Sequence, residues 1–534
     1  MPSSMDIRTV VFDDTERRSL PSETIESLHR HRILYFGNSM DSPSADSPAA
    51  NGSPLDSMQV DSMQVDRPTP PRGSVWLAWL VILATIGVIL FPGLLKQKLE
   101  AVDPSIILLE IQARYLVGAS TVSFDGKEQL KNQLAPVFGK GSLRQRLIGA
   151  VLLGELMGPG EAATSLSDLE QQVQDGRLTV DQEDDRKALG LLQQIQAGLI
   201  EKTPLSDSQS DEELATGRAL LAKRLGWVGK LAYLPPGSPD RAEREQLLAH
   251  AQRTLFVMVG TFGLAAVAAA VGFLLQILWW VFAASGRLKS GIPPLSGDGA
   301  IYAETFAAWM VLFVVLNLAL MYLPLPKWGL VWVLIPQIGS LGALAWPLFR
   351  GLRWSDVRQD LGLTLGEQPW SIPFIGVGAY LSALPVLGLA MVVTALLMAF
   401  MSQFAGNGEA AATPIHPIVE PILRGNWTLR LQLLFVAVFA AVPEEIMFRG
   451  ALYRHLREAK TQFGYICGVA FAAILSSFVF AVIHPQGLFG IPILMSLAMV
   501  FALVREWRGS IYPVMITHAL VNAGTSTLLL LIAD

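Results

Sequence analysis

Cysteine and charge are scarce in this 534-residue sequence. The single cysteine, Cys467, lies in an apolar run, so one chain can form neither a disulfide nor a cysteine-based metal site. Only 16% of the residues are charged, the net charge is −5, and no basic patch indicates nucleic acid as a partner. No His-Glu-x-x-His sequence occurs, so the usual zinc-protease signature is absent too.

Hydrophobic residues, by contrast, make up 51% of the chain, which is typical of a polytopic membrane protein. About nine apolar segments approach the roughly 20 residues that a membrane-crossing helix needs. Because lipid satisfies no backbone hydrogen bonds, we predict an all-α, polytopic helical membrane protein with about eight to nine transmembrane helices. The segments are 75–95, 255–283, 300–323, 328–349, 372–401, 429–448, 466–484, 487–504 and 511–532.

Residues 1–74 are predicted to form a disordered tail. Its second half is rich in Ser, Pro, Asp and Gly, and Asp-Ser-Met-Gln-Val occurs at 56–60 and again at 61–65. A segment of this composition buries too little apolar surface to fold. The segment 75–95 is then the first transmembrane helix.

Residues 96–253 are polar, with apolar residues at helical spacing in 106–115, 143–156 and 186–200. We predict a soluble helical insert between the first two membrane helices. It forms either a small helical bundle or a repeat-like surface that binds a partner. Residues 254–534 form the multi-pass membrane core.

Basic residues in the short loops gather on the side of the membrane that holds the N-terminus. Because positive charge marks the cytoplasmic face, we predict a cytoplasmic N-terminus and an insert on the opposite side. Arg449 then falls near the inner face, so the site beside it should open to the cytoplasm. We expect a bacterial plasma membrane or an internal membrane. The basic loop residues are Arg287, Lys289, Arg350, Arg353, Arg358, Arg454, Arg457, Lys460, Arg505 and Arg508 on this side, against Lys327, Arg424 and Arg430 on the other.

A carboxylate pair and an arginine lie where a membrane helix should still be apolar, in Pro443-Glu-Glu-Ile-Met-Phe-Arg449. A charge at membrane depth costs roughly 2.5–3.5 kcal/mol on insertion scales, which makes a functional role the default hypothesis. Glu445 and Arg449 are four residues apart and share a helix face, so we interpret them as a structural pair that holds the helix in register. Glu444 points elsewhere and is free for another role.

Two later apolar segments also carry polar residues: His484 in one, and His518 with Asn522 in the other. Glu444 can act as a general base, because partial burial raises a carboxyl pKa towards the working pH. His484 can orient the same water or shuttle its proton. His518 and Asn522 share a helix face and present an imidazole and an amide, which suit an oxyanion hole.

Alternatives remain open for each of these residues. Glu444, His484 and His518 have the composition of a His₂Glu zinc site with an open position for water. Taken singly, Glu445–Arg449 could be an ordinary buried ion pair, His484 a helix cap, and His518–Asn522 an interhelical hydrogen-bonding pair. Their joint occurrence on three late segments favours a catalytic centre.

The motifs Glu444-Glu445-x-x-x-Arg449, Phe480-x-x-x-His484 and His518-x-x-x-Asn522 resemble the signatures of the CPBP family in order and spacing. These CAAX-protease and bacteriocin-processing (Abi) proteins are intramembrane proteases and include the type II CAAX prenyl endopeptidases. The segment Trp354-Ser-Asp-Val-Arg-Gln-Asp is similar to the family's lead-in, so the resemblance covers about 350–534. It implies that Glu444 and His484 hold the catalytic water while His518 and Asn522 stabilise the oxyanion. Family members are commonly described as metalloproteases, and a metal-free glutamate mechanism is also argued for them.

The sequence therefore predicts an intramembrane endopeptidase, of metallo- or glutamate type, that cuts a membrane-associated and CAAX-like protein or peptide within the lipid bilayer. The rival hypothesis is a non-proteolytic membrane scaffold or immunity-type protein that binds a partner through its insert. Four polar groups kept in lipid argue against that rival. A transporter would show matching inverted halves, which this sequence lacks.

Overall fold

A computed structural model of the chain describes residues 73–91, 104–122, 141–180, 182–201, 210–236, 238, 240–322, 330–404, 416–459 and 464–533. All of them belong to one compact unit, Pro68–Asp534. The described residues are 84% helical and include no strand. Nearly all of the predicted tail lies outside them.

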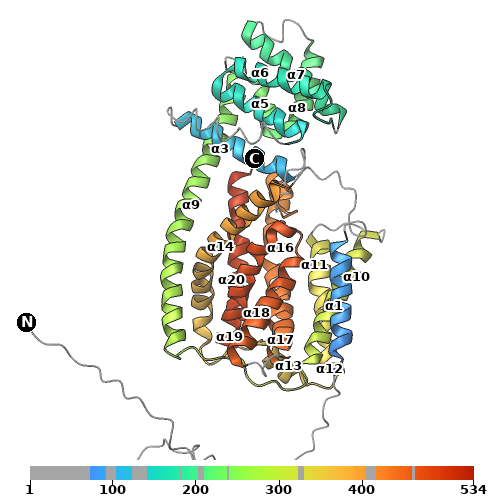
Figure 1. Ribbon diagram of the computed structural model, residues 1–534, viewed down its shortest axis with the longest axis vertical. Coiled ribbons are helices and arrows are strands. Elements are labelled where there is room, and N and C mark those ends of the chain that lie inside the picture. Colours follow the sequence, from blue (N-terminus) through green and yellow to red (C-terminus); the bar gives the residue numbers. More distant parts are fainter. Residues whose placement is uncertain are drawn as a thin grey trace, which may run out of the picture. The chain divides into compact units, whose positions relative to one another are not determined.

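Eight helical segments of the described residues are long and apolar enough to cross a membrane (Figure 1). The predicted all-α, polytopic membrane architecture is therefore confirmed. The helices that form these segments are α9 (Arg241–Ala284), α10 (Ala300–Tyr322), α11 (Leu330–Gly339) with the short α12 (Ala345–Phe349), α14 (Ile372–Ser402), α16 (Trp427–Glu445) with α17 (Tyr453–Ala459), α18 (Tyr465–Val482), α19 (Ile491–Arg508) and α20 (Tyr512–Ile532).

The first apolar helix, α1 (Val75–Leu90), is shorter than these segments. Its Ser74 side chain accepts a hydrogen bond from the Leu77 amide and so caps the helix. The backbone amides of Gly73 and Ser74 donate to the carboxylates of Asp298 and Glu304, which fixes the start of α1 beside α10. Residues 92–95 of the predicted span lie outside the described part of the chain.

Five helices of the predicted insert bury a hydrophobic core of their own, distinct from that of the membrane helices. Leucines of α5 and α7 are fully buried there, together with Trp227 of α8. Ser142 and Ser210 begin α5 and α8 with capping boxes, in which side chains satisfy the free amides of the first turn. The five helices are α3 (Pro104–Val122), α5 (Leu143–Met157), α6 (Pro159–Gln174), α7 (Glu183–Glu201) and α8 (Asp211–Ala232).

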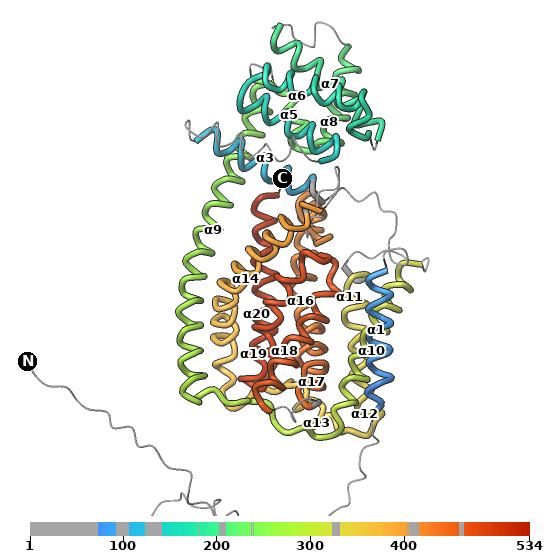
Figure 2. The backbone as a smooth tube through the Cα atoms, in the orientation of Figure 1, coloured from blue at the N-terminus to red at the C-terminus, as the bar shows by residue number. Residues whose placement is uncertain are grey.

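Helix α9 joins the insert to the membrane core without a break (Figures 1 and 2). Its 44 residues rise about 66 Å, roughly twice the thickness of a hydrocarbon core. The polar first part packs against α3, and the apolar remainder lies beside α14. The predicted division at 253/254 therefore falls inside one continuous helix.

The helix that carries the glutamate pair continues beyond the predicted end at Phe448. Helix α16 passes into a π-helix, Ile446–Leu452, and then into α17, which ends at Ala459. Local hydropathy falls at Arg449 and Arg454, but both side chains are buried and bonded within the core, so the helix does not need to end there. The glutamate pair consequently lies in the interior of a long helix.

A buried carboxylate, Asp360 of α13 (Trp354–Leu361), joins several elements at the α17 end of the core. It accepts hydrogen bonds from the Tyr302 hydroxyl (2.7 Å) and the Ser296 amide (3.2 Å), and its Oδ1 lies 3.8 Å from Nη2 of Arg454. Burial raises the pKa of Asp360, and these three partners oppose the rise. Asp360 thus fixes α13 against α10 and α17.

We expect Asp360→Ala to destabilise the protein by about 3–5 kcal/mol, because it leaves the buried Tyr302 hydroxyl without its acceptor and removes one of the two carboxylates beside the buried Arg454. The matched control is Asp356→Ala on the same helix, whose partner Arg353 is exposed. Thermal unfolding in detergent should show a large fall in midpoint for the first variant and a small one for the second. Equal shifts would contradict the role of Asp360.

Candidate active site

The glutamate pair stands at the junction of α16 and the π-helix that follows it. All seven residues of the π-helix are buried. A π-turn inserts an extra residue into the helical register, and such turns are frequent at functional sites. Glu444 and Glu445 are neighbours in the chain, so their side chains leave the helix in different directions.

Glu445 binds two partners through one oxygen. Its Oε1 accepts from Nη1 of Arg449 at 3.0 Å and from Nδ1 of His518 at 2.7 Å, and the side chain is fully buried. The ion pair inferred from the spacing is present. The bond to His518 comes from α20 and has no signal in the sequence, because it joins residues 73 positions apart.

Aromatic rings and a carbonyl complete the surroundings of Arg449. Its guanidinium lies 4.7 Å from the ring centre of Phe480 and 4.9 Å from that of Phe501. Its Nη2 donates to the carbonyl oxygen of Ala498 at 3.3 Å. Cation–π contacts and charge-assisted hydrogen bonds offset the loss of water around the buried cation. The π-helix is thereby held against α18 and α19.

Three helices bring Glu444, His484 and His518 together. Oε2 of Glu444 lies 3.7 Å from Nε2 of His484 and 3.9 Å from Nε2 of His518. Both separations exceed a direct hydrogen bond and fit a bridging group such as water. Glu444 and His484 are 18% and 17% exposed in their side chains, so they are accessible where Glu445 is not.

Both imidazole rings are fixed through Nδ1. Nδ1 of His484 contacts the Phe480 carbonyl oxygen at 2.5 Å, and Nδ1 of His518 contacts the Glu445 carboxylate. Because a carbonyl and a carboxylate only accept, Nδ1 is the protonated nitrogen in both rings. In the neutral rings the two Nε2 lone pairs therefore face Glu444.

The side chain of Asn522 is hydrogen-bonded to helix α16. Its Nδ2 donates to the Ala437 carbonyl oxygen on α16 at 2.7 Å. An interhelical hydrogen bond was the alternative to an oxyanion hole in the sequence analysis. The observed bond joins α20 to α16. The amide has a second N–H that this bond does not use.

His416, which precedes the short helix α15 (Val419–Arg424), adds a third imidazole that the sequence analysis did not single out. Burial, together with the charge of His484, lowers the pKa of His416 to about 4, and the charge of Glu444 opposes this shift. The ring is thus within electrostatic reach of the site. It lies in a loop outside every apolar segment, so hydropathy gave no signal for it.

The zinc alternative has the right donor types but no metal-binding arrangement. Among the residues that the structure describes, no group of three or more His, Cys, Asp and Glu side chains could hold a metal ion. Zinc binds nitrogen and oxygen ligands at about 2.0–2.2 Å and requires all of them to converge. The predicted ligand set of Glu444, His484 and His518 therefore stays a prediction.

Residues 426–524 match the family model described as type II CAAX prenyl endopeptidase Rce1-like. The predicted resemblance to CPBP proteases is confirmed for this part of the chain. The matched stretch begins at Asn426, the N-cap of α16, and includes every residue from Glu444 to Asn522 discussed above. No curated protein and no solved structure matches the chain.

Removing one member of the buried Glu445–Arg449 pair should cost more than removing both. Arg449→Leu leaves a buried carboxylate without its cation, at a cost of about 3–5 kcal/mol. In the double variant with Glu445→Leu, part of this loss should be recovered, as measured by a double-mutant cycle of unfolding in detergent. Additive losses would mean that the two side chains act independently.

Elemental analysis of the purified protein separates the two mechanisms. A His-ligated site predicts about one zinc per chain, lost in both His484→Ala and His518→Ala. A glutamate mechanism predicts catalytically active protein without stoichiometric metal. His455→Ala is the matched control, because that histidine is bonded to Trp79 and Gly299 away from Glu444.

Proposed function

We propose that this protein is an intramembrane endopeptidase that hydrolyses a peptide bond of a membrane-associated, CAAX-like protein or peptide. The observation that carries the proposal is the convergence of Glu444, His484 and His518 from three helices, with both rings fixed through Nδ1. The Rce1-like match supports a CAAX-type protease at the coarser level of the family.

Glu444 is the proposed general base. A water between Oε2 of Glu444 and Nε2 of His484 would donate one O–H to each, which turns an oxygen lone pair towards the substrate. As that oxygen bonds to the carbonyl carbon, Glu444 takes a water proton. When the C–N bond then breaks, the same carboxyl group gives the proton to the leaving nitrogen.

His518 is the proposed oxyanion partner. Its Nε2 donates to an oxyanion only when the ring is protonated, because Nδ1–H is already bonded to Glu445. The Glu445 carboxylate stabilises that imidazolium and fixes its orientation. The second N–H of Asn522 can add a donor, while its first holds α20 against α16. No step of this mechanism passes through zinc.

We expect Glu444→Gln to lower the cleavage rate of a farnesylated CAAX peptide in proteoliposomes by about 10²–10⁴-fold, because the base is lost. His484→Ala should act in the same direction. The matched control is Glu458→Gln on the continuation of the same helix, where the glutamate pairs with Arg454. The proposal is wrong if correctly inserted Glu444→Gln protein cleaves as fast as the unsubstituted protein.

A further inference from the structure

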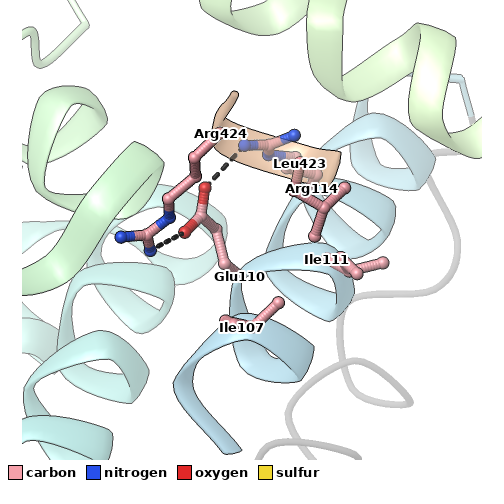
Figure 3. A pocket seen from close by; sticks show the side chains of 6 residues that line it. All are labelled: Ile107, Glu110, Ile111, Arg114, Leu423 and Arg424. Atoms are coloured by element: carbon pink, nitrogen blue, oxygen red, sulfur yellow. Dashed lines mark hydrogen bonds and ion pairs between the residues drawn. The ribbon is translucent and has the colours of Figure 1, made fainter. Parts of the chain in front are cut away.

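Three charged side chains lie where helix α3 of the insert meets the short helix α15 (Figure 3). Glu110 of α3 lies between two arginines: its Oε1 is 2.5 Å from Nη2 of Arg114, and its Oε2 is 3.3 Å from Nη2 of Arg424. Nη1 of Arg114 donates to the carbonyl oxygen of Ile532, the last residue of α20, at 3.1 Å. The contacts run from α15 through α3 to α20. We call Glu110, Arg114 and Arg424 the clamp.

Apolar packing surrounds the clamp. Ile107 of α3, Leu423 of α15 and Ile532 of α20 are buried in one cluster, which Ala533 completes. Gly226 in α8 has φ of +61°, and a Cβ there would clash with Oε2 of Glu110. Helix α8 of the insert therefore packs closely against the Glu110 carboxylate of α3.

The clamp reaches two of the three helices that bring the proposed catalytic side chains together, α16 and α20. Arg430 in the first turn of α16 is buried and donates to the Leu423 carbonyl oxygen of α15 at 2.9 Å. Asn426 caps α16 directly after α15. Helix α16 then runs from Trp427 to Glu445, and α20 carries His518 and Asn522 before it ends at Ile532.

We propose that Glu110 and Arg424 are positioning residues for the peptidase site. Through them the insert fixes α15 and the beginning of α16 against α20, and so sets the spacing of Glu444 and His518. The same contact holds the segment that begins at His416, whose carbonyl oxygen accepts a hydrogen bond from the Val419 amide of α15. This inference rests on the proposed peptidase function, and its first test does not depend on activity.

The first test measures whether the clamp holds the segment before α15. A single thiol is placed by His416→Cys in a Cys467→Ser background, and its reaction rate with a water-soluble methanethiosulfonate is measured. Arg424→Ala should raise this rate at least about fivefold, because loss of the contact permits local opening. Glu110→Gln, which keeps the side-chain shape, should also raise it, and Arg424→Lys should leave it within about twofold, because the charge is retained.

The matched control is Arg218→Ala. Arg218 pairs with Glu243 inside the insert and is 37% exposed, against 36% for Arg424, whose partner Glu110 lies across the contact between the insert and α15. Its removal should leave the labelling rate unchanged. An unchanged rate in both Arg424→Ala and Glu110→Gln overturns the proposal, whether or not the protein cleaves peptides.

The second test separates positioning from binding. With a farnesylated CAAX peptide, Arg424→Ala should lower kcat about tenfold with little change in KM, because the reacting groups are misplaced while substrate binding is kept. Arg424→Lys should restore kcat. If cleavage depends on Glu444 but kcat is unchanged in Arg424→Ala, the positioning role is wrong. If no Glu444-dependent cleavage exists, the proposed function fails, and the labelling rates alone decide whether the clamp holds the segment.

Discussion

The arrangement of the site depends on one buried carboxylate. Glu445 has no exposed surface, and its Oε1 binds both Arg449 on its own helix and His518 on α20. A charge in this environment is stable only with good geometry and full partners, so its removal affects every group attached to it. Glu445 thereby fixes the distance between α16 and α20 and the tautomer of His518.

The two adjacent glutamates have different chemical roles because they differ in accessibility. Glu444 is partly exposed, and its Oε2 lies 3.7 Å from Nε2 of His484 and 3.9 Å from Nε2 of His518, whereas Glu445 is closed off and bonded through Oε1 to Arg449 and His518. The same side-chain type can serve as a reacting group in one position and as an orienting group in the next. The helix makes this possible, because consecutive side chains point about 100° apart.

Long helices connect this centre to distant parts of the protein. The continuous helix from Trp427 to Ala459 places the glutamates far from both of its ends, and α9 extends from the membrane core into the insert. Both helices extend past the predicted boundaries at Phe448 and at 253/254. Hydropathy marks where a chain becomes polar, but a polar side chain with buried partners does not end a helix.

The sequence alone determined the all-α membrane architecture, the helices that carry Glu444, His484 and His518, and the spacing of Glu445 and Arg449. These follow from local periodicity, which specifies the face of a helix on which a residue lies. Tertiary structure decided that Glu445 orients His518, that Asn522 bonds to Ala437, and that α3 contacts α15 and α20. The reason is that periodicity does not specify which other helix that face will meet, and each of these contacts joins residues more than 70 positions apart.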